Sequence, residues 1–293
     1  MSLLISGIAL GCVYALIASG FSLIYRGTAI LNFAQGGFVV LGGYVAYTLA
    51  SSASLPFAVA VPLAVLVMGV FGWALQQAMF VRLAGRPLFT LFLLTLMIDS
   101  LLITGMNTYK PWSQSPKEIP TPWAHDLTTI AGSTVPTASL WVIGISIVVL
   151  AALAWWLSRS WLGLAMEVNA SDHELAGILG MRVRRVSAVA WAAGGALAAL
   201  AGTFLAVFPQ LLDPSSHAVG LRAIPAVILG GISSGMGAVA GGLIIGLVEV
   251  YTAAYAPDFL GTNLHLVVPY ALMLAILLVR PQGLFGKAEV HRA

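Results

Sequence analysis

The sequence predicts an all-α membrane protein, a polytopic bundle of about eight spanning segments of which some are broken by glycine. Of its 293 residues, 60% are hydrophobic and 8% are charged, whereas about 25% of the residues of an average soluble domain are charged. A transmembrane helix needs about 20 apolar residues, so this composition leaves little chain for a second domain. We therefore expect one transmembrane domain over residues 1–293.

Apolar runs bounded by charges or by Pro/Gly clusters predict where the crossings lie. The predicted spans are 3–25, 28–50, 55–81, 88–107, 138–157, 187–208 and 264–280. Residues 223–256 are apolar too, but GGISSGMG at 230–237 interrupts them, and we interpret this stretch as a turn between two short helices. Lipid cannot hydrogen-bond such irregular backbone, so it must lie inside protein or beside a water-filled cavity.

The distribution of cations predicts the orientation. If the loop 158–186 is cytoplasmic, most cations share its side, and only Lys110, Lys117 and Arg222 lie outside. The inner set is Arg26, Arg82, Arg86, Arg159, Arg182, Arg184, Arg185, Arg280, Lys287 and Arg292. This asymmetry is typical of a plasma-membrane protein, with an external N-terminus and a cytoplasmic C-terminus. A re-entrant 28–50 segment would instead turn the N-terminus inward.

Several classes of function are excluded by what the chain lacks. The net charge of +3 is too small for the basic face that binds nucleic acid. A single cysteine, Cys12, allows no internal disulfide, and the five histidines show no metal-ligand spacing. The phosphate loop GxxxxGK[ST] and the motifs HExxH and GxSxG are missing. We expect neither an enzyme nor a cofactor or metal, and the first apolar segment, which no basic region precedes, should stay in place.

Two hydrophilic loops stand out. The loop 108–137, which we expect outside, is rich in proline and carries Trp112 and Trp123, as an ordered cap at the membrane interface would. In the loop 158–186, Ser171 and Glu174 have the spacing of a capping box, and Gly180 follows as a helix stop. These signals predict a short cytoplasmic helix over residues 172–179.

Glycines four residues apart predict close helix packing, which we expect to be mostly intramolecular. The pairs are Gly7/Gly11, Gly231/Gly235, Gly237/Gly241 and Gly242/Gly246. A different pattern is the interruption of 28–50 by Gly36 and Gly37, which matches the interruption at Gly230 and Gly231. Paired broken segments in the two halves of a transporter point to a solute site within the membrane.

Polar residues inside the apolar runs are the candidates for lining a solute route. Asp99 and Glu249 are intramembrane carboxylates, which mark functional pathways by default. For Asp99 we weigh a functional and a structural role equally. For Glu249 we favour a structural role, as a polar contact between packed helices. Asn32 and Gln35 flank the Gly36–Gly37 break, and Ser233 and Ser234 lie in the second break. Their alternative role is to hydrogen-bond the backbone that each break frees.

Several short motifs spread over nearly the whole chain. They are GCVYALIASGF at 11–21, LNFAQGG at 31–37, LGGY at 41–44, GLAM at 163–166, AGILG at 176–180, AVILGGI at 226–232, Gly241–Gly242 and RPQGLFG at 280–286. Together they resemble the LivH-type permeases of branched-chain amino-acid ABC importers. The chain departs from the family's pattern at Gln35, where a histidine is usual, and at Glu167, where an arginine is usual.

The resemblance implies a permease subunit in the bacterial plasma (inner) membrane that moves branched-chain or related amino acids. Its implied partners are membrane lipid, a second permease subunit, two ATP-binding subunits and a periplasmic or lipid-anchored solute-binding protein. By analogy, the predicted short helix is the coupling helix that seats in an ATPase groove, with coupling residues Ser171, Glu174, Leu175, Ala176, Gly177, Ile178, Leu179 and Gly180. The alternative for this helix is a position on the bilayer surface.

Other functions stay open at this point. A permease of the same class for urea, short amides, aromatic acids or sugars has no distinguishing mark in the sequence. A proton-driven secondary carrier would use Asp99 and Glu249 as a relay. A channel is disfavoured, because no ring of repeated polar residues suggests a selectivity filter. If the chain carries a solute across the membrane, the candidate residues along its route are Asn32, Gln35, Gly36, Gly37, Asp99, Gly230, Gly231, Ser233 and Ser234.

Overall fold

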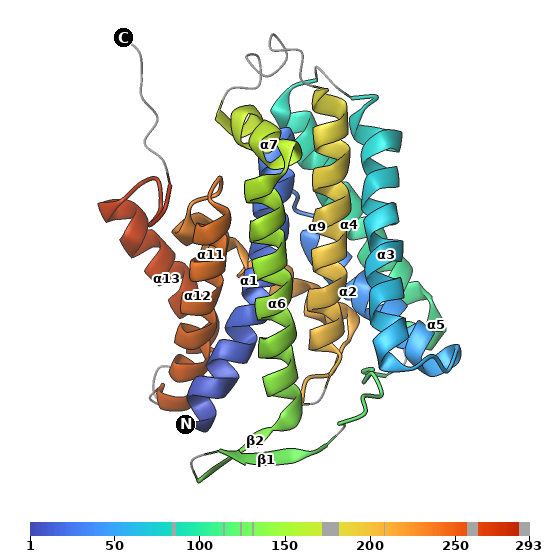
Figure 1. Cartoon of the computed structure of the whole chain (residues 1–293), viewed down its shortest axis with the longest axis vertical. Helices are drawn as coiled ribbons and strands as arrows, with labels where there is room; N and C mark the ends of the chain where they lie inside the picture. The colour runs from blue at the N-terminus through green and yellow to red at the C-terminus, as the bar shows by residue number, and fades with distance from the viewer. Residues whose placement is uncertain are drawn as a thin grey trace.

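A computed structural model describes residues 1–83, 86–113, 115–123, 125–130, 132–171, 182–207, 209–256 and 263–286. Within these ranges the chain is almost entirely helical and carries one small hairpin (Figure 1). The elements are α1 (Ser2–Thr28), α2 (Gln35–Tyr47), η1 (Thr48–Ser52), α3 (Phe57–Leu75), η2 (Gln76–Phe80), α4 (Leu88–Thr108), α5 (Lys110–Ser113), β1 (Leu127–Ile130), β2 (Ser133–Pro136), α6 (Thr137–Arg159), α7 (Trp161–Ser171), α9 (Val183–Leu205), η3 (Pro214–His217), α10 (Ala218–Arg222), α11 (Ile224–Gly230), α12 (Gly235–Tyr255) and α13 (Leu264–Val279).

The predicted class, a polytopic helical membrane protein, is confirmed, but the number of long spans is lower than about eight. In the described ranges, six helices are long and apolar enough to cross a membrane: α1, α3 with η2, α4, α6, α9 and α12. The apolar α13 has 16 residues, and α2 has 13. The difference arises because α2 and α13, which lie in the predicted spans 28–50 and 264–280, are too short to count as full crossings.

Proline and a left-handed residue set several helix boundaries. Pro56, Pro87 and Pro136 directly precede α3, α4 and α6, where a residue without an N–H group and with a fixed φ costs the helix nothing. At the other end of α1, Ala29 adopts a left-handed φ of 54° and donates its N–H group to the carbonyl of Tyr25. This conformation ends α1 and reverses the chain.

The bundle has two ends, which we call the hairpin end (with β1 and β2) and the α7 end (Figure 1). Helix α1 starts at the hairpin end and finishes at the α7 end, where Asn169 of α7 donates a hydrogen bond to the carbonyl of Arg26. Arg82 follows η2, Arg159 ends α6 and Arg182 directly precedes α9, and these helix ends lie at the α7 end, whereas α5, which begins with Lys110, lies towards the hairpin end. This segregation of cations agrees with the predicted orientation.

The predicted second span is a broken pass. From the end of α1 the chain continues without helix over residues 29–34, and α2 then starts inside the bundle and runs towards the hairpin end (Figure 1). There Tyr44 stacks on Trp112, with ring centroids 5.0 Å apart. The break lies before Gly36 and Gly37, which form the first turn of α2.

A second broken pass precedes α12 and was only partly predicted. It starts at the hairpin end, where Leu212 and Lys117 exchange two backbone hydrogen bonds of 2.7 and 2.9 Å. It continues through η3, α10 and α11 and ends near the α7 end, since Gly235, after the turn, lies close to the guanidinium of Arg26. Helix α12 is a long helix and not the short piece that was expected, because no glycine in 235–255 departs from helical conformation.

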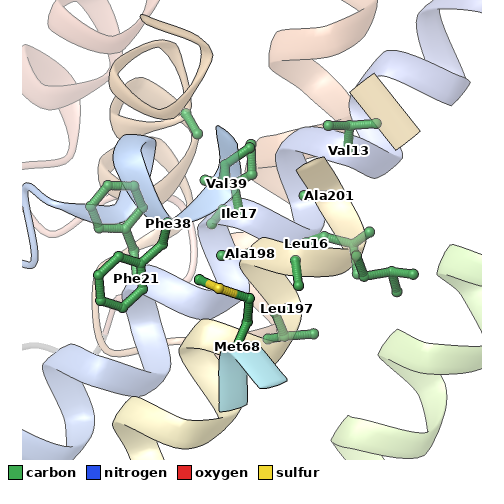
Figure 2. Close-up of a cluster of buried hydrophobic side chains, with 14 of the residues drawn as sticks. Val13, Leu16, Ile17, Phe21, Phe38, Val39, Met68, Leu197, Ala198 and Ala201 are labelled. Carbon is green, nitrogen blue, oxygen red and sulfur yellow. The ribbon is translucent and has the colours of Figure 1, made fainter. Parts of the chain in front are cut away.

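Helices α1 and α9 form the centre of the bundle. Most of both helices is buried, whereas α4 and α6 are largely exposed. Figure 2 shows Leu16 and Ile17 of α1, Phe38 of α2, Met68 of α3 and Leu197 of α9 in one apolar cluster. A side chain gains nothing by leaving lipid for an apolar core, so close packing is what holds these helices together.

Small residues bring the central helices into backbone contact. A Cβ atom added to Gly246 of α12 would overlap the backbone of Gly11 of α1, and one on Gly242 would overlap Ala15. Gly241 of α12 faces the carbonyl of Ala226 of α11 in the same way. The prediction of packing within the chain is confirmed for Gly7/Gly11, Gly237/Gly241 and Gly242/Gly246, whereas Gly231 and Gly235 lie on either side of the turn between α11 and α12. The sequence did not reveal a second contact of this kind, in which Gly202 of α9 lies against the carbonyl of Val39 of α2.

Several elements were not predicted, and α7 and the hairpin β1–β2 are the largest of them. Helix α7 occupies much of what was expected to be a loop before the coupling helix, and it ends at Ser171. The outer loop contains the hairpin β1–β2, in which Leu127 pairs with Pro136. The aromatic residues of this loop pack as an ordered cap: Trp123 stacks on Trp141 of α6, with ring centroids 4.7 Å apart.

Replacing Gly246 by leucine is expected to disrupt the contact between α1 and α12. The new side chain has no space against Gly11, and overpacking of this kind costs about 1–3 kcal/mol or more. The variant should melt at a lower temperature in detergent or fail to elute as a single species in size-exclusion chromatography. Gly144 of α6 is the control, because no atom lies within 4 Å of its added Cβ. Equal stability of Gly246→Leu and Gly144→Leu would contradict this packing.

Candidate functional site

The amino-terminal end of α2 lies against the middle of α4. The Asp99 carboxylate of α4 accepts a hydrogen bond of 2.9 Å from the N–H group of Gly37. No side chain from α2's own N-cap position satisfies these first N–H groups, which have no partner within a helix. A carboxylate at the positive end of the helix dipole is a favourable arrangement, and it is stronger where lipid excludes water.

Asn32 and Gln35 satisfy the polar groups that the break in this pass frees. The Asn32 side-chain oxygen accepts a 3.1 Å hydrogen bond from the N–H group of Ala34, and its amide donates to the Gln35 side-chain oxygen at 3.2 Å. Gln35 in turn donates to the carbonyl of Gly194 of α9 at 3.3 Å. Both side chains are fully buried. The observed hydrogen bonds are therefore those of the structural alternative that the sequence left open.

The two broken passes touch each other at this point. A Cβ atom added to Gly36 would lie 2.5 Å from the carbonyl oxygen of His217, and one added to Gly220 would overlap the backbone of Gly36. Both residues must therefore be glycine for α2 and α10 to meet at this distance. The first turn of α2 therefore packs against the segment formed by η3 and α10.

A second charged cluster joins α10, α12 and α1. Glu249 of α12 accepts a 2.5 Å hydrogen bond from the Tyr14 hydroxyl through one carboxylate oxygen, and its other oxygen lies 3.6 Å from Nη1 of Arg222. Tyr14 lies near the middle of α1, which is about 40 Å long for its 27 residues. The hydrocarbon core is about 30 Å thick, so the cluster lies within it. The expectation that Arg222 lies outside the membrane is wrong, because α10 is part of the second broken pass.

The four route candidates of the second break lie elsewhere, towards the α7 end. Gly230 accepts a backbone hydrogen bond of 3.1 Å from Phe285, and Leu229 accepts one of 2.8 Å from Leu284. The motif at 280–286 thus caps the carboxyl end of α11. Ser234 caps α12 by accepting a hydrogen bond from the N–H group of Gly237, and Ser233 is exposed.

The structure thus brings some predicted site residues together and separates others. One group gathers at the start of α2: Asn32, Gln35, Gly36, Gly37 and Asp99. The other group forms the α11–α12 turn: Gly230, Gly231, Ser233 and Ser234. Among the coupling residues, Ser171 ends α7, and Glu174, Leu175, Ala176, Gly177, Ile178, Leu179 and Gly180 lie outside the described residues.

Sequence reasoning missed four residues that complete these clusters. Thr95 accepts a 3.3 Å hydrogen bond from the N–H group of Phe33, and His217 packs against Gly36. Tyr14 and Arg222 both contact Glu249. A signal existed only for Arg222, since a cation directly before an apolar stretch with proline at 225 is consistent with a broken pass as well as with a loop.

The described residues include no group of three or more His, Cys, Asp or Glu side chains that could hold a metal ion. The polar groups inside the bundle contact helix ends, carbonyls and one another. Broken passes that meet within the membrane, with buried polar side chains around them, are the architecture of a membrane transport protein.

Comparison with known proteins identifies the family. Residues 3–277 match the model of the branched-chain amino acid transport system / permease component family, and the chain belongs to this family. It is 30% identical to the high-affinity branched-chain amino acid transport system permease protein LivH of Escherichia coli K12, over 98% of this chain and 96% of that protein. It is 26% identical to the corresponding protein BraD of Pseudomonas aeruginosa, over 99% and 96%. A probable LivH of Methanocaldococcus jannaschii is 27% identical, over 92% and 88%.

Replacing Asp99 by alanine is expected to loosen the start of α2, because the Gly37 N–H group loses its partner. Hydrogen bonds to charged groups contribute about 1.5–3 kcal/mol, so the melting temperature in detergent should fall. Asp99→Asn keeps an acceptor oxygen and should lose less. Ser100→Ala, at the exposed neighbouring position, is the control. An Asp99→Ala protein as stable as the Asn variant would contradict this role for the carboxylate.

Proposed function

We propose that the chain is the permease subunit of an ATP-driven importer for branched-chain or related amino acids in a bacterial plasma (inner) membrane. The observation that carries this proposal is family membership over residues 3–277, nearly the whole length of the chain. Relatives that are similar over their full length are named as branched-chain amino acid permease proteins. The subunit forms no covalent intermediate with the solute; it positions the solute and opens to one side of the membrane at a time.

The proposed route follows the two broken passes. It borders the start of α2, with Asn32, Gln35, Gly36, Gly37 and Asp99, and leaves past the α11–α12 turn, with Gly230, Gly231, Ser233 and Ser234. Helix ends and free backbone groups at breaks solvate charges without requiring a buried ion. The direct contact between the two passes at Gly36 and Gly220 supports this route, because a shift of one pass must displace the other.

The proposed partners are a second permease subunit, two ATP-binding subunits and a solute-binding protein. The absence of a phosphate loop from the sequence supports hydrolysis of ATP on separate subunits. The proposed coupling helix, residues 172–179, follows α7 directly. Since Asn169 of α7 and Ser187 of α9 donate hydrogen bonds to the carbonyls of Arg26 and Gly27, a push on α7 would reach the end of α1 next to the first broken pass.

A reconstituted importer tests the function and the route together. Proteoliposomes that contain all subunits should take up labelled leucine when ATP and the binding protein are supplied, and a pH gradient alone should drive no uptake. Asn32→Leu and Ser233→Leu should each reduce uptake about tenfold, because an apolar side chain replaces a polar group on the route. Ser158→Leu, at an exposed position of α6, is the control. Normal uptake by both route variants would contradict the route, and uptake driven by the pH gradient alone would contradict the function.

A separate experiment tests the coupling helix. Charged residues at the proposed docking face, as in Gly177→Glu with Leu179→Glu, should separate ATP hydrolysis from leucine uptake or release the ATP-binding subunits. A buried charge without a partner is strongly unfavourable at an interface, so uptake should fall about tenfold or more. Co-purification and ATPase activity distinguish the two results. If assembly and uptake both persist, residues 172–179 are not the coupling element.

A further inference from the structure

A guanidinium group lies inside the membrane with several of its donors unused. Nη1 of Arg222 lies 3.6 Å from Glu249, which is longer than a hydrogen bond, and the guanidinium also lies next to the Tyr14 hydroxyl. A guanidinium carries five N–H donors in a planar fork. About one third of the Arg222 side chain is exposed, compared with 8% for the Glu249 side chain. Within the described residues, Glu249 therefore balances the charge of Arg222, and Glu249 and Tyr14 together leave several of its five N–H donors free.

The neighbouring contacts hold Arg222 in place. Glu249 is itself fixed by the 2.5 Å hydrogen bond from Tyr14. The backbone before Arg222 is held by Tyr270 of α13, whose hydroxyl donates to the carbonyl of Leu221 at 3.3 Å. Helix α10 also packs closely against the start of α2, where the backbone of Gly220 contacts that of Gly36. The contacts of Gly220 and Leu221 hold the backbone next to Arg222, and Glu249 and Tyr14 are the side chains that orient its guanidinium.

The exposed edge of this guanidinium must meet a polar group in the assembled protein. A cation that faces lipid inside the hydrocarbon core is costly, and such side chains almost always face a cavity or a partner. Glu249 lies six residues from the end of α12 at Tyr255, about 9 Å along the helix. The cluster thus lies in the half of the membrane next to the hairpin end, which the cation distribution assigns to the outside.

We infer that Arg222 binds the carboxylate of the transported amino acid as it enters from the outer side. This inference rests on the proposed function. The planar fork of arginine matches a carboxylate with two parallel hydrogen bonds. Glu249 and Tyr14 are positioning residues: they orient the guanidinium and offset its charge while no solute is bound. Arg222 lies on the same segment that packs against Gly36, so a solute bound there contacts the second broken pass next to the proposed route.

The test uses the complete importer in proteoliposomes with ATP, the binding protein and labelled leucine. Arg222→Gln should reduce uptake about tenfold or more, the loss expected when one charge-assisted pair is removed. Arg222→Lys keeps the charge but not the fork, and should recover only part of the uptake. Lys117→Gln removes one cation at the hairpin end, away from the cluster, and is the matched control. If wild type and Lys117→Gln take up no leucine, the proposed function fails, whatever Arg222 does.

The double variant Arg222→Gln/Glu249→Gln separates binding from charge balance. If Arg222 serves only to neutralise Glu249, removal of both charges restores uptake to the wild-type level, and the inference is overturned. If Arg222 binds the solute, the double variant assembles but stays about as defective as Arg222→Gln, while its ATPase activity still responds to the binding protein. If either variant no longer co-purifies with the second permease subunit, the partner of Arg222 is a carboxylate of that subunit and not of the solute. This result would also overturn the inference.

Discussion

Lipid offers no hydrogen bonds to the backbone, and this constraint explains most of what is unusual in the structure. Two passes of the chain are not continuous helices, so each must find partners for its free N–H and C=O groups within the protein. The first pass uses Asn32, Thr95 and Asp99 for this purpose. The second uses the side chain of Asp213 as the cap of η3, the side chain of Ser234 as the cap of α12, and the backbone of residues 284 and 285 at the end of α11.

The same constraint determines where the broken passes lie. The first packs mainly against α9, the second packs against α12 and α1, and α1 and α9 are the most buried of the long helices. Glycine at 36, 202 and 220 lets backbone approach backbone, which leaves no space for lipid or for a side chain between them. Dense packing of this kind is rigid within each group of helices. The contact of α2 with α10 through Gly36 and Gly220 therefore links the two broken passes, so that a shift of one displaces the other.

Charge inside the membrane follows a consistent pattern. Asp99 lies at a helix amino terminus, and Glu249 lies between a phenol hydroxyl and a guanidinium. Neither carboxylate is left with only apolar neighbours, which would be far more costly than exposure to water. For Asp99 the observed hydrogen bond supports a structural role and does not oppose a functional one, since the start of α2 belongs to the proposed route. For Glu249 the tie to Tyr14 agrees with the role that the sequence favoured.

The sequence by itself determined the class, the long continuous spans and the grouping of cations at one end. Insertion into a membrane depends on the length of each apolar run and on the charges that flank it, and both are local properties of the sequence. The sequence also determined that Gly242 and Gly246 bring helices together, since spacing along a helix fixes which residues share a face. Only the tertiary structure decided that Arg222 lies inside the membrane against Glu249, that His217 and Gly220 meet Gly36, and that residues 280–286 cap α11. These contacts join segments that are far apart in the chain, so the residue pattern within either segment does not predict them.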